Sequence, residues 1–289
     1  MSQVIQDVTA PEMPGFACIA VPNSGSMSDQ PTNAVIVGTH EVFIVDPGDI
    51  SGVEIVTAAL ARRENVHVKA IVLTHAHPDH ATAAPGLKER FGCPILLNPK
   101  EQPILRQYLT WTAVDGALTG GMTLTVEDIH LEVIDTPGHS PGHVSLFDPV
   151  SRILIAGDIV SGMGTVGIFP PHGKMAEYLD SLARVQEIAP HIVIPGHGPI
   201  LTDPPSLFLR YIERRRTREA EILAVVTRAP TTIAQIVVEL YPDVRPHFRH
   251  AAAATTLAHL EKLRDEGRVV PETDDLMHSQ WGTTTTMSA

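Results

Sequence analysis

The apolar residues of the first half of the chain form short runs that alternate with polar segments. Continuous apolar runs bounded by Gly, Pro or polar residues predict buried strands, and apolar residues three and four apart predict helices. On this pattern we expect strands at 32–38, 41–48, 70–73 and 94–97, helices at 51–63 and 83–91, and a segment at 102–121 that begins as a helix and then becomes irregular. The polar segment 24–31 predicts a mobile loop.

A second set of runs with the same character follows. Here we expect strands at 130–135, 144–147, 153–156 and 192–194 and a helix at 176–188. Two sets of strands, each accompanied by helices, predict an α/β fold in which two sheets pack together and helices cover them, a four-layer αββα sandwich.

From Ser206 onward the spacing of apolar residues is helical. We expect helices at 207–226, 231–240 and 248–266 and a short strand at 267–271. This order predicts a small winged-helix-like domain at 206–272 after a catalytic domain at 1–205. The polar, Thr-rich segment 273–289 has too few apolar residues to predict structure, and we expect a flexible tail.

Composition narrows the class of protein. The chain has 289 residues, of which 43% are hydrophobic and 4% aromatic, and no apolar run is long enough to span a membrane. The N-terminal segment lacks a basic stretch followed by an apolar one, so we expect no signal peptide. The two cysteines, Cys18 and Cys93, lie among apolar neighbours and form no disulfide framework. We therefore expect a cytoplasmic protein without a membrane partner.

Acidic residues are concentrated in the N-terminal part. Residues 1–205 contain 10 Lys and Arg against 22 Asp and Glu, a difference that equals the formal net charge of -12 for the chain. An acidic body repels phosphate backbones, which argues against a nucleic-acid partner. In the helical part, Arg210, Arg214 and Arg218 share a helix face, but acids such as Glu213 are interleaved with them. This favours a solvated, salt-bridged helix.

The strongest functional signal is the segment 74–80, with the sequence THAHPDH. Three histidines and one aspartate at the end of a strand predict a metal site, because Zn²⁺ accepts imidazole nitrogen and carboxylate oxygen as ligands. His75 and His77 alternate along an extended backbone and point the same way. After the Pro bend, Asp79 and His80 are free to address a second ion. A polar loop that contains histidines by chance is the alternative.

Ligand-type residues recur after later strands, at His139, Asp158 and His197. Loops at one end of packed strands can converge, so residues far apart in sequence can share one site. The carboxylate of Asp158 can bridge two ions. His143 is a candidate for a group hydrogen-bonded to the site, with a structural role in its turn as the alternative.

Two further residues border the predicted site. Asp46 ends a strand, and we expect it to cap the metal-binding loop through backbone N–H groups rather than to bind metal. His172 lies on a loop that we expect to border the mouth of the site. His172 either contacts the substrate or is simply exposed to solvent, and the sequence does not distinguish these alternatives.

The motifs carry a resemblance. The chain resembles the metallo-β-lactamase superfamily, and within it the glyoxalase II-like branch with two metals, through HAHPDH at 75–80, TPGH at 136–139, GD at 157–158 and PGHG at 195–198. The helical end, with YIERRRTRE at 211–219 and LEKL at 260–263, resembles the winged-helix end of the β-lactamase-like protein 2 family, some of whose members are endoribonucleases.

The resemblance implies a ligand set. One zinc would be held by His75, His77 and His139, the other by Asp79, His80 and His197, and Asp158 and a hydroxide would bridge them. Iron and manganese are alternatives to zinc. The catalytic roles fall to Asp79, Asp158 and His143.

A dinuclear site implies attack of a hydroxide on a carbonyl or phosphoryl centre without a covalent enzyme intermediate. Our first hypothesis is hydrolysis of an ester, thioester or lactone bond in a small-molecule substrate. The second is a single-strand-specific endoribonuclease whose helical end grips RNA, and the third is a non-catalytic binding module. A β-lactamase in the strict sense is disfavoured, because those enzymes generally lack an acid at the position of Asp158.

The helical end has apolar faces that should not stand in water. We expect them to pack on the main domain, where they would shape the substrate pocket, or on a second copy of the chain in a homodimer.

Overall fold

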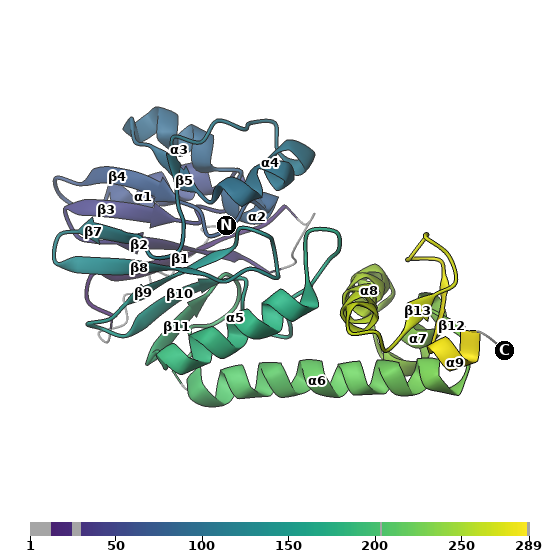
Figure 1. Cartoon of the computed structure of the whole chain (residues 1–289). Coiled ribbons are helices and arrows are strands. Elements are labelled where there is room, and N and C mark those ends of the chain that lie inside the picture. Colours follow the sequence, from purple (N-terminus) through teal and green to yellow (C-terminus); the bar gives the residue numbers. More distant parts are fainter. Residues whose placement is uncertain (1–12, 25–29, 203, 288–289) are drawn as a thin grey trace.

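The computed structural model describes residues 13–24, 30–202 and 204–287. Two sheets lie face to face with helices outside them, and a smaller helical domain stands beside one end of this sandwich (Figure 1). The predicted αββα architecture is therefore confirmed. The N-terminal segment on which the signal-peptide prediction rests lies outside the described residues, as does most of the loop expected at 24–31.

The first sheet has six strands in the order β1-β2-β3-β4-β5-β6. Its strands are β1 (Phe16–Val21), β2 (Thr32–Val37), β3 (Glu41–Val45), β4 (His67–Val72), β5 (Ile95–Leu97) and β6 (Gly116–Ala117). β1, β2 and β3 pair antiparallel, and β3 to β6 pair parallel. The sequence pattern missed β1 and β6.

Helices cover the outer face of this sheet. They are α1 (Gly52–Leu60), α2 (Pro78–Ala81), α3 (Ala84–Phe91) and α4 (Gln102–Tyr108), the last preceded by a short 3-10 helix, η1 (Pro99–Glu101). α3 ends at Gly92, which adopts the left-handed conformation (φ 66°) that glycine accepts without strain.

The second sheet has five strands in the order β11-β10-β9-β8-β7. Its strands are β7 (Thr123–Val126), β8 (Ile129–Asp135), β9 (Val144–Asp148), β10 (Ile153–Gly157) and β11 (Ile192–Pro195), and α5 (Met175–Ile188) lies on its outer face. β10 and β11 pair parallel, whereas the other pairs are antiparallel. The sequence pattern missed β7.

Successive residues of the inner strands enter different cores, because side chains alternate across a strand. Ile36 of β2 packs among the helices on the outer face, whereas its neighbour Val35 packs between the two sheets. Ile71 and Val72 of β4 divide in the same way. Both faces of these strands are buried, which explains why their sequences are continuous apolar runs rather than alternating ones.

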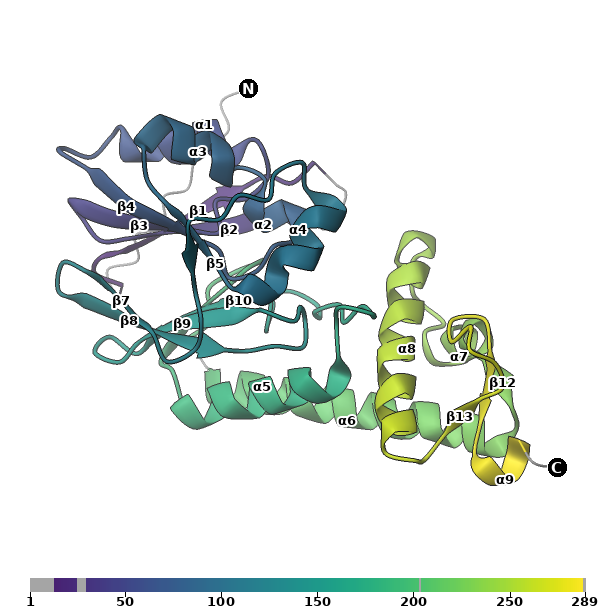
Figure 2. The same ribbon diagram turned by 45° about the horizontal axis from the view of Figure 1, so that its top comes forward.

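The 25-residue helix α6 (Pro204–Arg228) is shared by both parts of the molecule. Its first half, which includes Phe208 and Ile212, packs on the second sheet and α5, and its second half, which includes Ile222 and Val226, enters the core of the helical domain. Figure 2 shows α6 running from beneath α5 to this domain. Neither α6 nor any other helix in the described ranges combines the length and apolar character that crossing a membrane requires.

The helical domain is completed by β12 (Thr231–Thr232), α7 (Ile233–Leu240), η2 (Pro246–Phe248), α8 (Arg249–Asp265), β13 (Val270–Pro271), β14 (Gln280–Gly282) and α9 (Thr284–Met287). Its three strands form a small sheet in the order β12-β14-β13. The prediction of a flexible tail from residue 273 is wrong for β14. Trp281 is fully buried there, and its indole N–H donates to the carbonyl of Leu276 at 3.0 Å. One large side chain orders a segment that is otherwise polar.

Candidate metal centre

The predicted ligands lie where strands end at one edge of the two sheets. β4 leads into the segment 74–80, and β10 leads directly into Asp158. β11, the parallel neighbour of β10, ends two residues before His197. The loop between β8 and β9 contributes His139. The structure therefore brings together all the segments that the sequence singled out.

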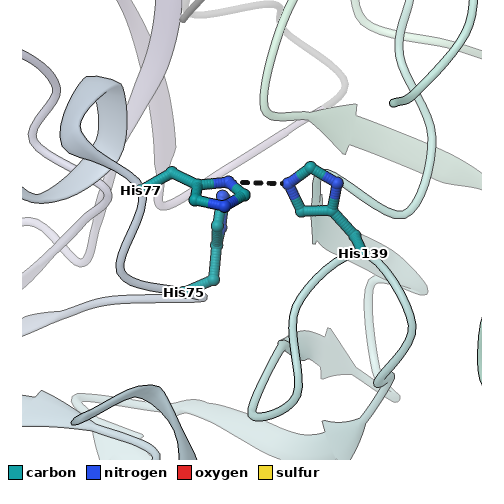
Figure 3. A group of neighbouring side chains, drawn as sticks. All are labelled: His75, His77 and His139. Atoms are coloured by element: carbon teal, nitrogen blue, oxygen red, sulfur yellow. Dashed lines mark hydrogen bonds between the residues drawn. The ribbon is translucent and has the colours of Figure 1, made fainter. Parts of the chain in front are cut away.

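His75, His77 and His139 form one group, and their ligand atoms lie within 4.8 Å of one another. The Nε2 atom of His139 lies 2.9 Å from the Nδ1 atom of His77. Figure 3 shows these two rings facing each other, with the His75 ring beside them. All three side chains are buried.

Asp79, His80 and His197 form a second group within the same limit of 4.8 Å. The Nε2 atom of His197 lies 3.3 Å from a carboxylate oxygen of Asp79 and 3.3 Å from the Nε2 atom of His80. These residues are buried as well.

Asp158 lies between the two groups. Its Oδ2 atom is 3.7 Å from Nε2 of His139 in the first group and 3.5 Å from Nε2 of His197 in the second. Its Oδ1 atom is 3.6 Å from Nε2 of His80. A single carboxylate thus reaches both groups.

In His75, His139 and His197 the Nδ1 atom contacts a protein oxygen, which leaves Nε2 to face the centre. Nδ1 of His139 contacts the carbonyl oxygen of Gly167 at 2.9 Å, and Nδ1 of His197 contacts that of Pro31 at 3.0 Å. Nδ1 of His75 contacts the Thr74 hydroxyl at 3.0 Å. Such partners fix the orientation of an imidazole and direct its other nitrogen at a metal.

The residues present fit a pair of metal ions. Nε2 of His75 and Oδ1 of Asp158 are buried without a hydrogen-bond partner, although buried polar atoms are normally satisfied. The facing ring nitrogens of His77 and His139 need a proton or a cation between them. Imidazoles and carboxylates in this number are the donor set of zinc and related ions.

The pKa shifts differ between the two groups of ligands. Burial lowers the pKa of His77 to about 3, and His139 adds to this effect. Burial raises the pKa of Asp158, but His197 and His80 lower it more, to well below its usual range. Burial lowers the pKa of His197, whereas Asp158 raises it more, to about 10. The neutral ring of His77 and the protonated ring of His197 therefore lie on either side of an ionised carboxylate, and a cation would replace the proton of His197.

Asp46 occupies the position expected for a cap of the metal-binding loop. One carboxylate oxygen accepts from the backbone N–H of Thr74 at 2.7 Å, and the other accepts from the Thr74 hydroxyl at 2.6 Å. The second oxygen also lies 2.9 Å from Nδ1 of His80. Asp46 thus orients His80 in addition to capping the loop.

His143 is buried, with both ring nitrogens engaged by the protein. Nδ1 contacts the Thr136 hydroxyl at 2.8 Å, and Nε2 accepts from the backbone N–H of Asp158 at 3.0 Å. His172 is half-buried on the loop after β10, where its Nε2 contacts the side chain of Gln107 at 2.8 Å.

Sequence reasoning missed Glu101. Its fully buried carboxylate accepts from the backbone N–H of Ala76 at 2.9 Å and from that of Gly142 at 2.6 Å. These two residues belong to the loops that carry His77 and His139. Glu101 therefore ties the two loops together, and burial raises its pKa. The sequence offers only one acid in a short Pro-containing segment, which is a weak signal.

Glycine is needed where the loops approach closely. A Cβ atom at Gly196 would lie 2.2 Å from Oδ1 of Asp158 and 2.8 Å from the ring of His80. Gly196, directly before His197, therefore leaves room for two other site residues.

Comparison with known proteins agrees with this geometry. The metallo-beta-lactamase superfamily model matches residues 27–197, and the model of the beta-lactamase associated winged helix domain matches residues 232–281. The Beta-lactamase-like protein 2 homolog of Caenorhabditis elegans is 28% identical over 256 residues, which are 86% of this chain and 83% of that protein.

Two further proteins are similar over large parts of the chain. The atrochrysone carboxyl ACP thioesterase of Aspergillus fumigatus is 28% identical over 207 residues, which are 70% of this chain and 61% of that protein. The crystal structure of a beta-lactamase domain protein from Burkholderia ambifaria shares the fold, with a TM-score of 0.81 and 23% identity over 94% of this chain and 92% of that one. The chain therefore belongs to the metallo-beta-lactamase superfamily and carries the winged helix domain associated with it.

Proposed function

We propose that this protein is a hydrolase with two metal ions, zinc in the first instance, that cleaves an ester, thioester or lactone bond of a small-molecule substrate. The observation that carries the proposal is the position of Asp158, whose carboxylate lies 3.7 Å from His139 in one group and 3.5 Å from His197 in the other. Because one carboxylate lies within reach of both groups of ligands, the arrangement supports a site for two neighbouring ions.

When bound, such ions supply Lewis acidity, which polarises a substrate oxygen and makes water a nucleophile near neutral pH. His75, His77 and His139 would hold one ion, and Asp79, His80 and His197 the other. Asp158, whose carboxyl pKa lies well below its usual range, would stay ionised and offset part of their charge. His143 holds the backbone of Asp158, and Asp46 holds the ring of His80. Iron and manganese are alternatives to zinc, because iron also accepts imidazole ligands and manganese accepts carboxylate ligands.

The choice of an acyl substrate rests on charge and on similarity. The body of the chain is acidic, with 10 basic and 22 acidic residues in 1–205, which disfavours a polyanionic substrate. The similar Aspergillus fumigatus protein is named a thioesterase. The helical domain would border the substrate site, since Tyr211 of α6 bonds the backbone of Ser161 at 3.0 Å in the loop after Asp158.

A single-strand-specific endoribonuclease is the second candidate. It is favoured by the similarity to the Beta-lactamase-like protein 2 homolog, which extends over both the catalytic and the winged helix parts. The exposed guanidinium groups of Arg214 and Arg216 on α6 offer a small basic surface.

A substrate panel separates the two candidates. Metal-free protein is reconstituted with Zn²⁺ and assayed with acyl thioesters, esters, lactones, β-lactams and a single-stranded RNA. We expect turnover of at least one acyl substrate, abolished by Asp158→Ala. Cleavage of RNA without turnover of any acyl substrate would establish the ribonuclease instead. A cytoplasmic location and a homodimer remain predictions that this assay does not address.

A further inference from the structure

The loop between β10 and α5 is held by the helical domain at the point where it meets the metal centre. Arg215 of α6 donates from Nη2 to the carbonyl of Val166. The backbone N–H of Ile168 donates to the hydroxyl of Thr255 on α8 at 3.5 Å. Between these residues lies Gly167, whose carbonyl oxygen contacts Nδ1 of His139 at 2.9 Å. Two side chains of the helical domain thus fix both neighbours of the residue that orients a metal ligand.

Arg215 also supports His139 from a second direction. Its guanidinium lies over the ring of Tyr178 on α5, 5.3 Å from the ring centroid. The backbone of Tyr178 packs against Gly138, where a Cβ atom would lie 2.2 Å from the Tyr178 nitrogen. Because Gly138 directly precedes His139, Tyr178 connects Arg215 to the backbone beside this ligand.

The position of Arg215 is costly. Its side chain is only 5% exposed and its Nε atom has no hydrogen-bond partner, so a full charge is buried with incomplete compensation. An apolar side chain would avoid this cost, yet it could not bind the Val166 carbonyl. The contacts of Arg215 with Val166 and Tyr178 therefore point to a role beyond packing.

We propose that Arg215 and Thr255 are positioning residues for His139, so that the helices α6 and α8 set the affinity of one of the two metal positions. They hold the Gly167 carbonyl where it accepts the proton of Nδ1, and this leaves Nε2 of His139 free to bind the ion. The inference rests on the proposed two-metal site. Partners of this kind commonly change metal affinity by about 10–100-fold.

The test uses matched variants of the full chain. Thr255→Val removes the hydroxyl with little change in volume, whereas Thr255→Ser retains it and serves as the control. Arg215→Met removes the guanidinium, and Arg218→Met is its control. Arg218 lies on the same helix but bonds the carbonyl of Leu240 and stacks on Tyr241 at 4.1 Å, within the helical domain.

Metal-free proteins are titrated with Zn²⁺ in competition with a chromophoric chelator, and His139→Ala identifies the binding step that depends on His139. We expect this step to weaken by about 10–100-fold in Arg215→Met and Thr255→Val, while the other step is unchanged. Thr255→Ser and Arg218→Met should retain both steps. Circular dichroism verifies folding, and if Arg215→Met does not fold, Thr255→Val decides.

Three results have distinct meanings. Wild-type affinity for both ions in folded Thr255→Val overturns the inference, and so does an equal loss in the variants and their controls. Fewer than two binding steps in the wild-type protein would instead overturn the two-metal proposal on which the inference rests.

Discussion

The backbone N–H of Asp158 donates to Nε2 of His143 at 3.0 Å, while the carboxylate of the same aspartate lies between the two ligand groups. We therefore expect His143 to act on the centre through Asp158. Removing either residue should affect catalysis, but by different amounts and for different reasons.

We expect Asp158→Ala to leave the protein folded, to weaken metal binding and to reduce turnover strongly, because both groups lose their shared carboxylate. His143→Ala should reduce turnover by only about 10–100-fold, as is typical of residues that orient a ligand. Steady-state kinetics and metal analysis of both variants test this. Equal losses of activity with the metal content intact would contradict the assignment.

Glu101 provides a second test of how the loops are held. Glu101→Gln replaces one of two accepting oxygens with a donor, so either Ala76 or Gly142 loses the acceptor for its buried N–H. We expect a loss of roughly 1–3 kcal/mol in the free energy of unfolding, measured by urea denaturation. Glu89→Gln, the same change at an exposed position of α3, should have little effect. Unchanged stability in Glu101→Gln would show that the loops hold their positions without this acid.

The grouping of the candidate metal ligands was predictable because their chemistry is local in sequence. The segment 74–80 carries four ligand-type residues after a strand, and the other ligands follow strands in Gly-containing turns. The role of Glu101 was not predictable, since its two partners lie 25 and 41 residues away along the chain and only the fold brings them together.

The arginines of α6 show a different limit. The interleaved acids predict a solvated helix, and this is wrong for Arg215 and Glu219, which are 5% and 9% exposed. Tyr211, Arg215 and Glu219 are spaced four apart and continue one stripe that faces the protein interior. The spacing of these residues therefore predicts the buried face correctly, whereas their charges predict an exposed one.

Metal removal should change stability as well as activity. An ion that binds only the folded state stabilises it by about 2.7 kcal/mol at a concentration 100 times its Kd. We expect a chelator to lower Tm and added Zn²⁺ to restore it. Elemental analysis should then show two ions per chain. At most one ion at saturation would contradict the two-metal centre.

Glu127 predicts a pH dependence away from the metal centre. Hydrogen bonds from the backbone N–H of His40, the largest contribution, and from Thr39 lower the pKa of the Glu127 carboxyl to about 2 from 4.5. A carboxyl with a depressed pKa stabilises the fold above its unfolded pKa, and this stabilisation is lost as the pH falls from about 4.5 towards 2.

Glu127→Gln should therefore lower Tm at neutral pH, and the difference from wild type should shrink as the solution is acidified through this range. The effect will be modest, because the side chain is exposed to solvent. Glu132→Gln, which removes an exposed acid from the neighbouring strand, serves as the control. A Tm difference between Glu127→Gln and wild type that is the same at pH 7 and pH 3 would contradict the assignment.

The buried position of Arg215 also bears on nucleic-acid binding. Of the run 214–216, only Arg214 and Arg216 are exposed, and Arg218 stacks on Tyr241 inside the helical domain. This run therefore offers two exposed cations, and residues 206–272 as a whole have 11 basic against 9 acidic residues. Such a balance disfavours tight binding of a phosphate backbone, because affinity for nucleic acids grows with the number of phosphates neutralised. We expect no micromolar binding of a labelled single-stranded RNA in fluorescence anisotropy at low or moderate salt, and we expect Arg214→Glu with Arg216→Glu to leave acyl hydrolysis unchanged. Micromolar binding that weakens steeply with salt and is lost in this double variant would instead place RNA on α6.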